Sequence, residues 1–283
     1  MASDRALAGQ LERLARSARI VLVAGLPGTG KSLLIHQLAH LAADAGRVIH
    51  LLQWDVARPV FEASPAGRRY PMADGVTHAV VRKAVGLWAR RALLEWQRRC
   101  AAPRHALIGE APLVGNRLIE LARRMDDATE PVLAAASCRF VIAVPSAAVR
   151  GFLEAERERR AARPLHPRER EDAPPAVLKA LWRELVGVAQ ALGIPVDAGA
   201  GEPPYDPLVY QRVYEALLRH RHADVAALQT VLPTSTFSVY EVAVPRVDLL
   251  PREEEADAAV REAEALFPDA PALARDVARW WVV

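Results

Sequence analysis

The sequence predicts an α/β fold in which a parallel β-sheet of about five strands is covered by helices on both faces. Short apolar runs typical of buried strands alternate with longer segments in which apolar residues recur every three or four positions. A glycine-rich turn joins the first apolar run, 19–24, to the helical pattern that follows it. This alternation favours parallel strands, because crossover helices then cover both faces of the sheet.

The residue pattern places strands and helices alternately along the chain. The expected strands are 19–24, 47–54, 105–109, 139–144 and 237–244. The expected helices are 4–16, 31–45, 79–99, 116–124, 147–162, 176–192, 207–220, 252–266 and 271–281. Residues 55–78 are expected to form a loop that contains Pro59, Pro65 and Pro71.

We expect a single domain with two parts. Residues 1–198 form the core, which includes a helical lid at about 147–175. Residues 199–283 form a C-terminal extension that completes the same domain with the strand 237–244 and the last helices. The boundary is placed there because residues 196–206 are rich in glycine and proline and read as a loop.

Composition limits the classes of function. The chain has 283 residues, of which 52% are hydrophobic, and a formal net charge of +3. This mild excess suits a polyanionic small substrate and is far below that of a protein that coats nucleic acid. Cys100 and Cys138 are too few for a disulfide framework or a zinc site. Neither a secretion signal nor a membrane span is recognisable, so we expect a cytoplasmic protein without a membrane partner.

The most informative motif is a complete phosphate-binding loop of the pattern G-x-x-x-x-G-K-[ST]. Its flanks fit, because an apolar strand precedes it and a helical pattern follows it. Backbone N–H groups of such a loop surround a di- or triphosphate, the lysine reaches the β- and γ-phosphates, and the serine hydroxyl binds Mg²⁺. The residues expected to bind nucleotide are Gly25, Leu26, Pro27, Gly28, Thr29, Gly30, Lys31 and Ser32.

An aspartate and an arginine follow the second expected strand. Asp55 comes directly after it and Arg58 lies three residues later. Ligands of open parallel sheets bind beyond the carboxyl ends of the strands, where a carboxylate can accept the proton of a hydroxyl. An arginine one turn further along can stabilise a phosphoryl group. The alternative is an ordinary turn aspartate with a solvated arginine.

Glu110 ends the third expected strand, where an acid would hold Mg²⁺ directly or through water. The sequence after it leads to Asn116 and Arg117, which we expect to face the substrate. A plain helix cap is an equal alternative for Asn116.

The segment 150–170 is rich in arginine with interleaved glutamate. Most of these charges are expected to lie on a solvated helix with i,i+4 pairs. Arginines of a lid can also neutralise phosphate charge during phosphoryl transfer. The lid candidates are Arg157, Arg160 and Arg163.

Residues 70–78 lie between Asp55 and the helix 79–99, where they are candidates to cover the acceptor. An ordinary loop with a helix cap is the alternative. The scattered histidines, including His50 and His105, are expected to be structural. The candidates for contact with the acceptor are Trp54, Asp74, Thr77, His78 and Arg82.

These motifs together resemble the P-loop kinases of the nucleoside, nucleotide and polynucleotide kinase superfamily, in the polynucleotide-kinase-like or zeta-toxin-like branch. The resemblance covers about residues 19–170 and rests on the loop 25–32, Asp55, Arg58, Glu110 and the segment 150–170. It implies a P-loop NTPase-type sheet, with Asp55 as the acceptor base and Arg58 as the phosphate clamp. Glu110 replaces the more usual aspartate, and residues 199–235 have no counterpart.

The expected function is therefore that of a kinase that uses ATP and Mg²⁺. It would transfer the γ-phosphoryl group to a hydroxyl of a small metabolite, a nucleoside or nucleotide, or a polynucleotide end. The alternatives are a regulatory P-loop ATPase or nucleotide switch without a small acceptor, and a protein that only binds nucleotide. The N-K-x-D motif of switch GTPases is missing from the sequence. Trp280 and Trp281 are expected to anchor the last helix or to form an oligomer contact.

Overall fold

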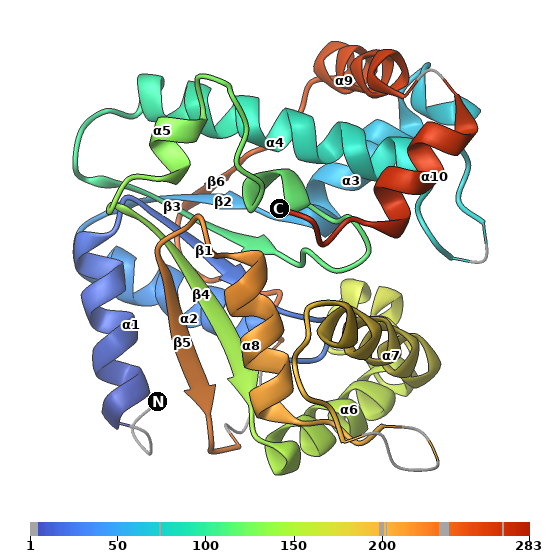
Figure 1. The fold of residues 1–283 in the computed structure, drawn as a ribbon. Coiled ribbons are helices and arrows are strands. Elements are labelled where there is room, and N and C mark those ends of the chain that lie inside the picture. The colour runs from blue at the N-terminus through green and yellow to red at the C-terminus, as the bar shows by residue number, and fades with distance from the viewer. Residues whose placement is uncertain (1–4, 74, 198–200, 202, 232–237, 268) are drawn as a thin grey trace.

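The computed structural model describes residues 5–73, 75–197, 201, 203–231, 238–267 and 269–283. Six strands form one sheet in the order β5-β4-β1-β3-β2-β6, and every neighbouring pair is parallel. Helices lie between them along the chain (Figure 1). The strands are β1 (Ile20–Ala24), β2 (Val48–Leu52), β3 (His105–Ala111), β4 (Cys138–Pro145), β5 (Ala223–Leu228) and β6 (Arg246–Asp248). The α/β class with a parallel sheet is confirmed, although the sheet has six strands instead of five.

Ten α-helices occur in the described ranges. They are α1 (Arg5–Ser17), α2 (Lys31–Asp44), α3 (Trp54–Ala63), α4 (Ala79–Arg99), α5 (Glu130–Leu133), α6 (Ala147–Ala162), α7 (Pro175–Ala191), α8 (Pro207–Leu217), α9 (Glu253–Leu266) and α10 (Ala270–Ala278). Short 3-10 helices occur at Gly67–Arg69, Ile119–Leu121 and Pro167–Glu171. No helix among the described residues combines the length and apolar character that crossing a membrane requires.

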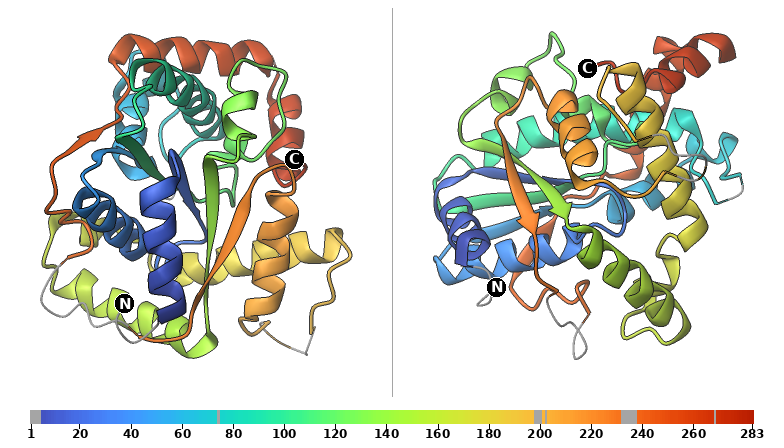
Figure 2. Two further views of the ribbon diagram at one scale, coloured as in Figure 1. Left: turned by 90° about the vertical axis from the view of Figure 1, so that its left-hand side faces the viewer. Right: turned by 60° about the horizontal axis from the view of Figure 1, so that its bottom comes forward.

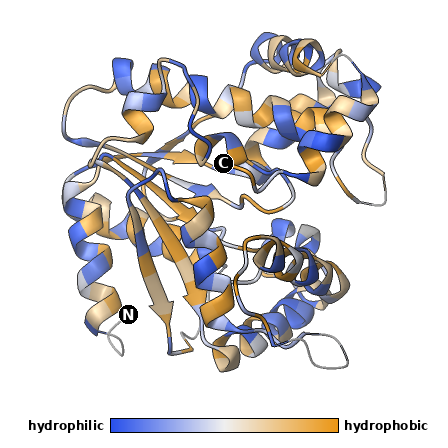
Figure 3. Cartoon of the chain, viewed as in Figure 1, coloured by the Kyte–Doolittle hydropathy of each residue, from blue (hydrophilic) through white to orange (hydrophobic). Residues whose placement is uncertain are grey.

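The central strands alternate their side chains between two apolar layers. Ile20, Leu22 and Ala24 of β1 pack with α3, α4, α7, α8 and α9, whereas Val21 and Val23 pack with α1 and α2. Figures 1 and 2 show these helices on opposite sides of the sheet, and Figure 3 shows that the strands are mostly hydrophobic. Strands covered on both faces read as continuous apolar runs, which explains why the sequence revealed them.

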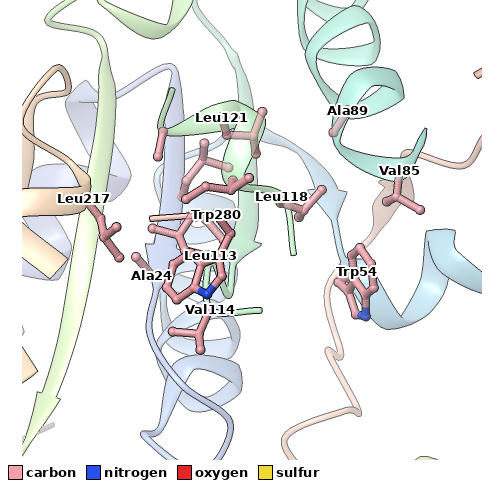
Figure 4. Close-up of a cluster of buried hydrophobic side chains, with 14 of the residues drawn as sticks. Ala24, Trp54, Val85, Ala89, Leu113, Val114, Leu118, Leu121, Leu217 and Trp280 are labelled. Carbon is pink, nitrogen blue, oxygen red and sulfur yellow. The ribbon is translucent and has the colours of Figure 1, made fainter. Parts of the chain in front are cut away.

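The end of the chain belongs to the larger of these two layers. Trp280 is 3% exposed and packs in the same cluster as Ala24 and Leu113. Figure 4 shows its indole ring among these side chains. The residues after α10 therefore complete the core beside the sheet.

The C-terminal strands lie elsewhere than the sequence indicated. Residues 238–244 form no strand, and Phe237 lies outside the described residues. The edge strands are instead β5 and β6, which the sequence analysis missed. The β5 sequence, Ala-Asp-Val-Ala-Ala-Leu, is rich in alanine, which favours helices, so pairing with β4 overrides local propensity. β6 has three residues and no buried position, which gives no hydrophobic signal.

Two further segments differ from the prediction. Residues 54–63 form α3 even though Pro59 lies inside it, so the expected loop at 55–78 begins only after this helix. The expected helix at 116–124 is wrong, since only the 3-10 turn Ile119–Leu121 forms there. Asn116 and Leu118 have φ angles of 63° and 60°, a left-handed conformation that an α-helix cannot include.

Ala226 tests the position of β5 in the sheet. It is fully buried against the α1–α2 layer, whereas its neighbour Ala227 is exposed. We expect Ala226→Asp to lower the free energy of unfolding by about 2–4 kcal/mol, because a carboxylate is buried without a partner. The matched control Ala227→Asp should stay within about 0.5 kcal/mol of the parent in urea denaturation. Equal effects of the two substitutions would contradict the strand.

Candidate active site

The glycine-rich turn joins β1 to the first turn of α2. Gly25, Gly28 and Gly30 have φ angles of 153°, 75° and 86°, which side-chain-bearing residues rarely adopt. A Cβ atom on Gly25 would lie 2.6 Å from the Tyr210 hydroxyl oxygen, and one on Gly30 would lie 2.9 Å from the Leu228 Cδ1 atom. Gly30 is the N-cap of α2 and has no side-chain cap, so the N–H groups of the first helical turn have no acceptor within the helix.

Lys31 places an ammonium group in this turn. The side chain is buried, and its Nζ donates a hydrogen bond to the Leu26 carbonyl oxygen at 3.0 Å. Burial lowers the pKa of Lys31 to about 8, while the nearby Glu110 and Asp55 carboxylates oppose the decrease. The buried ammonium is therefore short of negative charge, which an anion in the turn would supply.

One cavity of about 690 Å³ connects the turn to the proposed acceptor side. This volume lies within the range of ligand pockets. The cavity lies beyond the carboxyl ends of β1 and β3, next to α6 and α7 (Figure 1). Of the residues predicted from sequence, the cavity is lined by Pro27, Gly28, Gly30, Lys31, Ser32, Trp54, Asp55, Arg58, Thr77, Glu110, Arg117, Arg157 and Arg160.

Asp55 lies in the first turn of α3 and lines the same cavity as Gly28 and Lys31. It is exposed to the cavity, and its charge shifts the pKa values of Lys31, Glu110 and Arg117, so it lies close to all three groups. The carboxylate thus faces a space that contains cationic groups, where it can accept a proton from a bound hydroxyl.

Arg58 lies one turn further along α3 and already has a partner. Its Nη1 donates to both carboxylate oxygens of Glu62 at 2.9 Å. Glu62 also accepts a hydrogen bond from the Thr77 hydroxyl at 3.1 Å. Arg58 therefore reaches the cavity only as part of an Arg58–Glu62–Thr77 group, which the sequence reading did not anticipate.

Glu110 is the sixth residue of β3 and is 8% exposed. Its Oε1 accepts a hydrogen bond from the Trp54 backbone N–H at 2.8 Å, which fixes the start of α3. Burial raises the pKa of Glu110 and the Asp55 carboxylate adds to the increase, while Lys31 opposes it. The Glu110 carboxylate and the Ser32 hydroxyl line the same cavity, and such oxygen ligands are the ones that Mg²⁺ prefers.

The loop after β3 has an unusual backbone that places Arg117 in the cavity. Leu113 and Leu118 have φ angles of 62° and 60°, and Gly115 and Asn116 between them are also left-handed. Left-handed leucines are costly and occur where the surrounding structure holds them, often at functional sites. In the described part of the chain, the Arg117 guanidinium makes no hydrogen bond or ion pair, although it lines the cavity.

Asn116 turns away from the cavity. Its side chain is fully buried, and neither amide atom has a hydrogen-bond partner among the described residues.

The lid arginines differ in their contacts. Arg157 donates to Asp172, and its Nη1 atom is buried without a partner in the described chain. That atom lies 3.5 Å from the position of a Cβ on Gly28, so it is directly above the glycine turn. Arg160 is held by Glu156 and Glu169. Arg163 ends α6, is exposed and does not line the cavity.

Two of the remaining acceptor candidates lie outside the cavity lining. His78 caps α4 by accepting a hydrogen bond from the Val80 N–H at 3.2 Å. Arg82 donates to the Gly115 carbonyl oxygen and so supports the loop that carries Arg117. Asp74 lies outside the described residues.

Three tyrosines that the sequence analysis missed hold the loops around the cavity. The Tyr210 hydroxyl accepts a hydrogen bond from the Leu26 N–H at 3.0 Å. The Tyr214 and Tyr205 hydroxyls donate to the carbonyl oxygens of Pro112 and Pro145, each at 2.9 Å. The loops after β1, β3 and β4 are thus tied to α8 or to the residues just before it. The sequence signal that could have revealed these contacts is the close spacing of the three tyrosines at positions 205, 210 and 214.

The described geometry defines an α/β protein with a glycine-rich turn at the carboxyl edge of its sheet and a cavity that this turn helps to line. Comparison of the chain with protein-family models, curated proteins and solved structures finds no match.

Lys31 gives a test of the site's electrostatics. We expect Lys31→Met to raise the free energy of unfolding at pH 7 by on the order of 1–3 kcal/mol, because it removes a buried charge. The Leu26 carbonyl oxygen keeps its bond from the Thr29 hydroxyl at 2.7 Å. The folded-state pKa is below the unfolded value, so the parent gains stability as pH rises through about 8 and the difference shrinks toward pH 10.5. Urea denaturation at several pH values measures this, and a pH-independent difference would contradict it.

Proposed function

We propose that the protein is a phosphotransferase that uses ATP and Mg²⁺ to phosphorylate a hydroxyl group. The observation that carries the proposal is the shared cavity, whose walls include both the Lys31 turn and Asp55. A phosphate donor and an acceptor bound at these walls would lie in the same enclosed space. Phosphoryl transfer depends mainly on such positioning and on charge stabilisation.

The donor end would bind the triphosphate through the backbone N–H groups of the turn, with Lys31 contacting the β- and γ-phosphates. Arg157 supports this assignment, because its unpaired Nη1 atom lies above Gly28. The side chains of Leu153, Leu178 and Leu228 surround the turn and can pack against the nucleoside. Gln229 and Thr230, which follow β5, also line the cavity and offer polar groups to the base.

Ser32 and Glu110 would hold the metal ion. These two residues fit a magnesium ion, because a hydroxyl and a carboxylate are hard oxygen ligands. The Ser32 hydroxyl also makes no hydrogen bond to the described residues. When bound, Mg²⁺ supplies positive charge against the phosphate oxygens.

Asp55 would act on the acceptor. One of its carboxylate oxygens would accept the proton of the acceptor hydroxyl. At the same time the hydroxyl oxygen would bond to the γ-phosphorus of ATP, and the bond between this phosphorus and the β,γ-bridging oxygen would break. The products are ADP and the phosphorylated acceptor. Lys31, Arg157 and Arg117 would stabilise the charge on the transferred group. Arg117 suits this role better than Arg58, because Glu62 already engages Arg58.

The acceptor side favours a compact molecule. Trp54, Met72 and Val76 give this wall apolar surface, and Thr77 adds a hydroxyl that is bonded to Glu62. A nucleoside, nucleotide or small metabolite would fill such a pocket. A polynucleotide end is the remaining member of the proposed class, and steep salt dependence of binding would identify it.

Asp55 provides the direct test of phosphoryl transfer. Asp55→Asn should lower acceptor-dependent ADP formation by about 10²–10⁴-fold, because the amide cannot accept the proton. Nucleotide affinity should stay unchanged. The assay uses a panel of nucleosides, nucleotides and small alcohols with ATP, and exposed Asp44 at the end of α2 provides the control Asp44→Asn. Full ATP turnover without any acceptor, equal in the parent and Asp55→Asn, would instead indicate a regulatory ATPase.

Substitutions of Arg117 test whether its guanidinium stabilises charge in the cavity or only supports the structure. Arg117→Ala should lower kcat/KM for the acceptor by about 10–10³-fold, since the cavity loses an unpaired guanidinium. Arg117→Lys should restore part of the activity. Exposed Arg163, which ends α6 outside the cavity, provides the control Arg163→Ala. A kcat/KM equal to that of the control would remove Arg117 from the proposed site.

A further inference from the structure

A second group of chemically reactive side chains lies at the other end of the sheet. His50 comes from the middle of β2, His105 is the first residue of β3, and Cys100 caps the C-terminal end of α4. Their side-chain ligand atoms all lie within 4.8 Å of one another. His105 precedes Glu110 by five residues on β3, which corresponds to about 17 Å along the strand. The group is therefore separate from the proposed catalytic cavity.

The distances between these atoms fit metal coordination. The His50 Nε2 and His105 Nδ1 atoms are 3.0 Å apart, and the Cys100 Sγ atom is 3.9 Å from His50 Nε2. In a tetrahedral zinc site, nitrogen and sulfur ligand atoms are separated by about 3.3–3.6 Å, given the usual metal–ligand lengths. The His50–His105 and His50–Cys100 separations would each have to change by well below 1 Å to match that geometry. The three atoms supply three ligands, and a water molecule or another group can take the fourth position.

The surroundings hold the three ligands in place. The Arg19 guanidinium donates to the carbonyl oxygens of Cys100, Ala102 and His105, which fixes the short loop that carries two of the ligands. The third ligand, His50, is 7% exposed and packs edge-on against Trp96, with ring centroids 5.7 Å apart. Cys100 and His105 are half-buried, so an ion can reach the site from solvent.

We propose that His50, Cys100 and His105 form a binding site for Zn²⁺ or a similar borderline divalent cation. Two imidazole nitrogens and one thiolate are the donors that such ions prefer over Mg²⁺ or Ca²⁺. Binding releases the Cys100 thiol proton to solvent. The ion replaces the hydrogen bond between His50 Nε2 and His105 Nδ1, and each imidazole stays neutral with its proton on the ring nitrogen that does not bind the ion. The ion would tie together β2, β3 and the end of α4, and so stabilise the fold by mass action.

A second histidine pair must be removed before metal binding at the proposed site is measured. His36 and His40 lie on α2 with ring centroids 4.5 Å apart, and they could bind a divalent ion weakly on their own. The double variant His36→Gln/His40→Gln removes this pair and leaves the proposed site intact. Co²⁺ is the spectroscopic probe in this background, because a cobalt–thiolate bond absorbs in the near ultraviolet. Zn²⁺ affinity is measured by competition with a chromogenic chelator.

We expect one Co²⁺ per chain, with thiolate absorption that disappears on Cys100→Ser. Zn²⁺ affinity should fall at least tenfold in Cys100→Ser and in His105→Gln. Zn²⁺ should raise the thermal midpoint of the background protein and leave that of Cys100→Ser unchanged. Circular dichroism confirms that each variant is folded.

Two results would overturn the metal site. One is a Zn²⁺ dissociation constant above about 100 µM in the background protein, which is too weak for a built site. The other is tight binding that persists in both Cys100→Ser and His105→Gln, which would place the ion elsewhere. Neither outcome depends on the proposed kinase activity, because the experiment needs no nucleotide.

Discussion

The buried ammonium of Lys31 is the constraint around which the candidate active site is arranged. A lysine side chain is rarely buried without a paired carboxylate. Here the hydrogen bond that Nζ makes is to the neutral carbonyl of Leu26, and the carboxylates of Glu110 and Asp55 act from nearby. An anion bound in the turn would lower the free-energy cost of this arrangement, which is why the proposed function assigns a polyanionic ligand to it.

The C-terminal part of the chain supports the loops that surround the candidate site, although the sequence suggested only an extension. The tyrosines at 205, 210 and 214 connect to the loops after β4, β1 and β3. Burial raises the pKa of Tyr210 to about 12, so its hydroxyl stays protonated beside the glycine turn. Strand β5 then forms one edge of the sheet, and the residues after it line the cavity. Removing this segment would therefore free the turn as well as the edge of the sheet.

Local sequence patterns predicted the central fold because the signals there are local. β1 and β4 are continuous apolar runs covered on both faces, and Asp206 with Pro207 marks the start of α8. β5 could not be found this way, because its pairing partner β4 lies about 80 residues earlier in the chain and alanine alone favours a helix. The sequence does not reveal α3, because Pro59 lies inside it and proline usually breaks a helix.

The residues of the candidate site that belong to a sequence motif were predictable. The contacts between residues that are far apart in the sequence were less so. The turn of residues 25–32, Asp55 and Glu110 lie together as parallel-strand geometry requires. The ion pairs Arg58–Glu62 and Arg160–Glu156 are i,i+4 pairs that form once α3 and α6 are helical, whereas the contact of Arg160 with Glu169 depends on how the chain folds back. His50 and Cys100 are 50 residues apart in sequence, so their proximity is likewise a tertiary feature.

The most direct measurement is a structure of the protein with Mg²⁺ and a non-hydrolysable ATP analogue. We expect the triphosphate to occupy the turn of residues 25–32, with Lys31 Nζ moved from the Leu26 carbonyl oxygen to a phosphate oxygen. We also expect Asp55 to face the γ-phosphate across space large enough for an acceptor. A nucleotide bound elsewhere, or an Asp55 side chain directed into bulk solvent, would contradict the proposal.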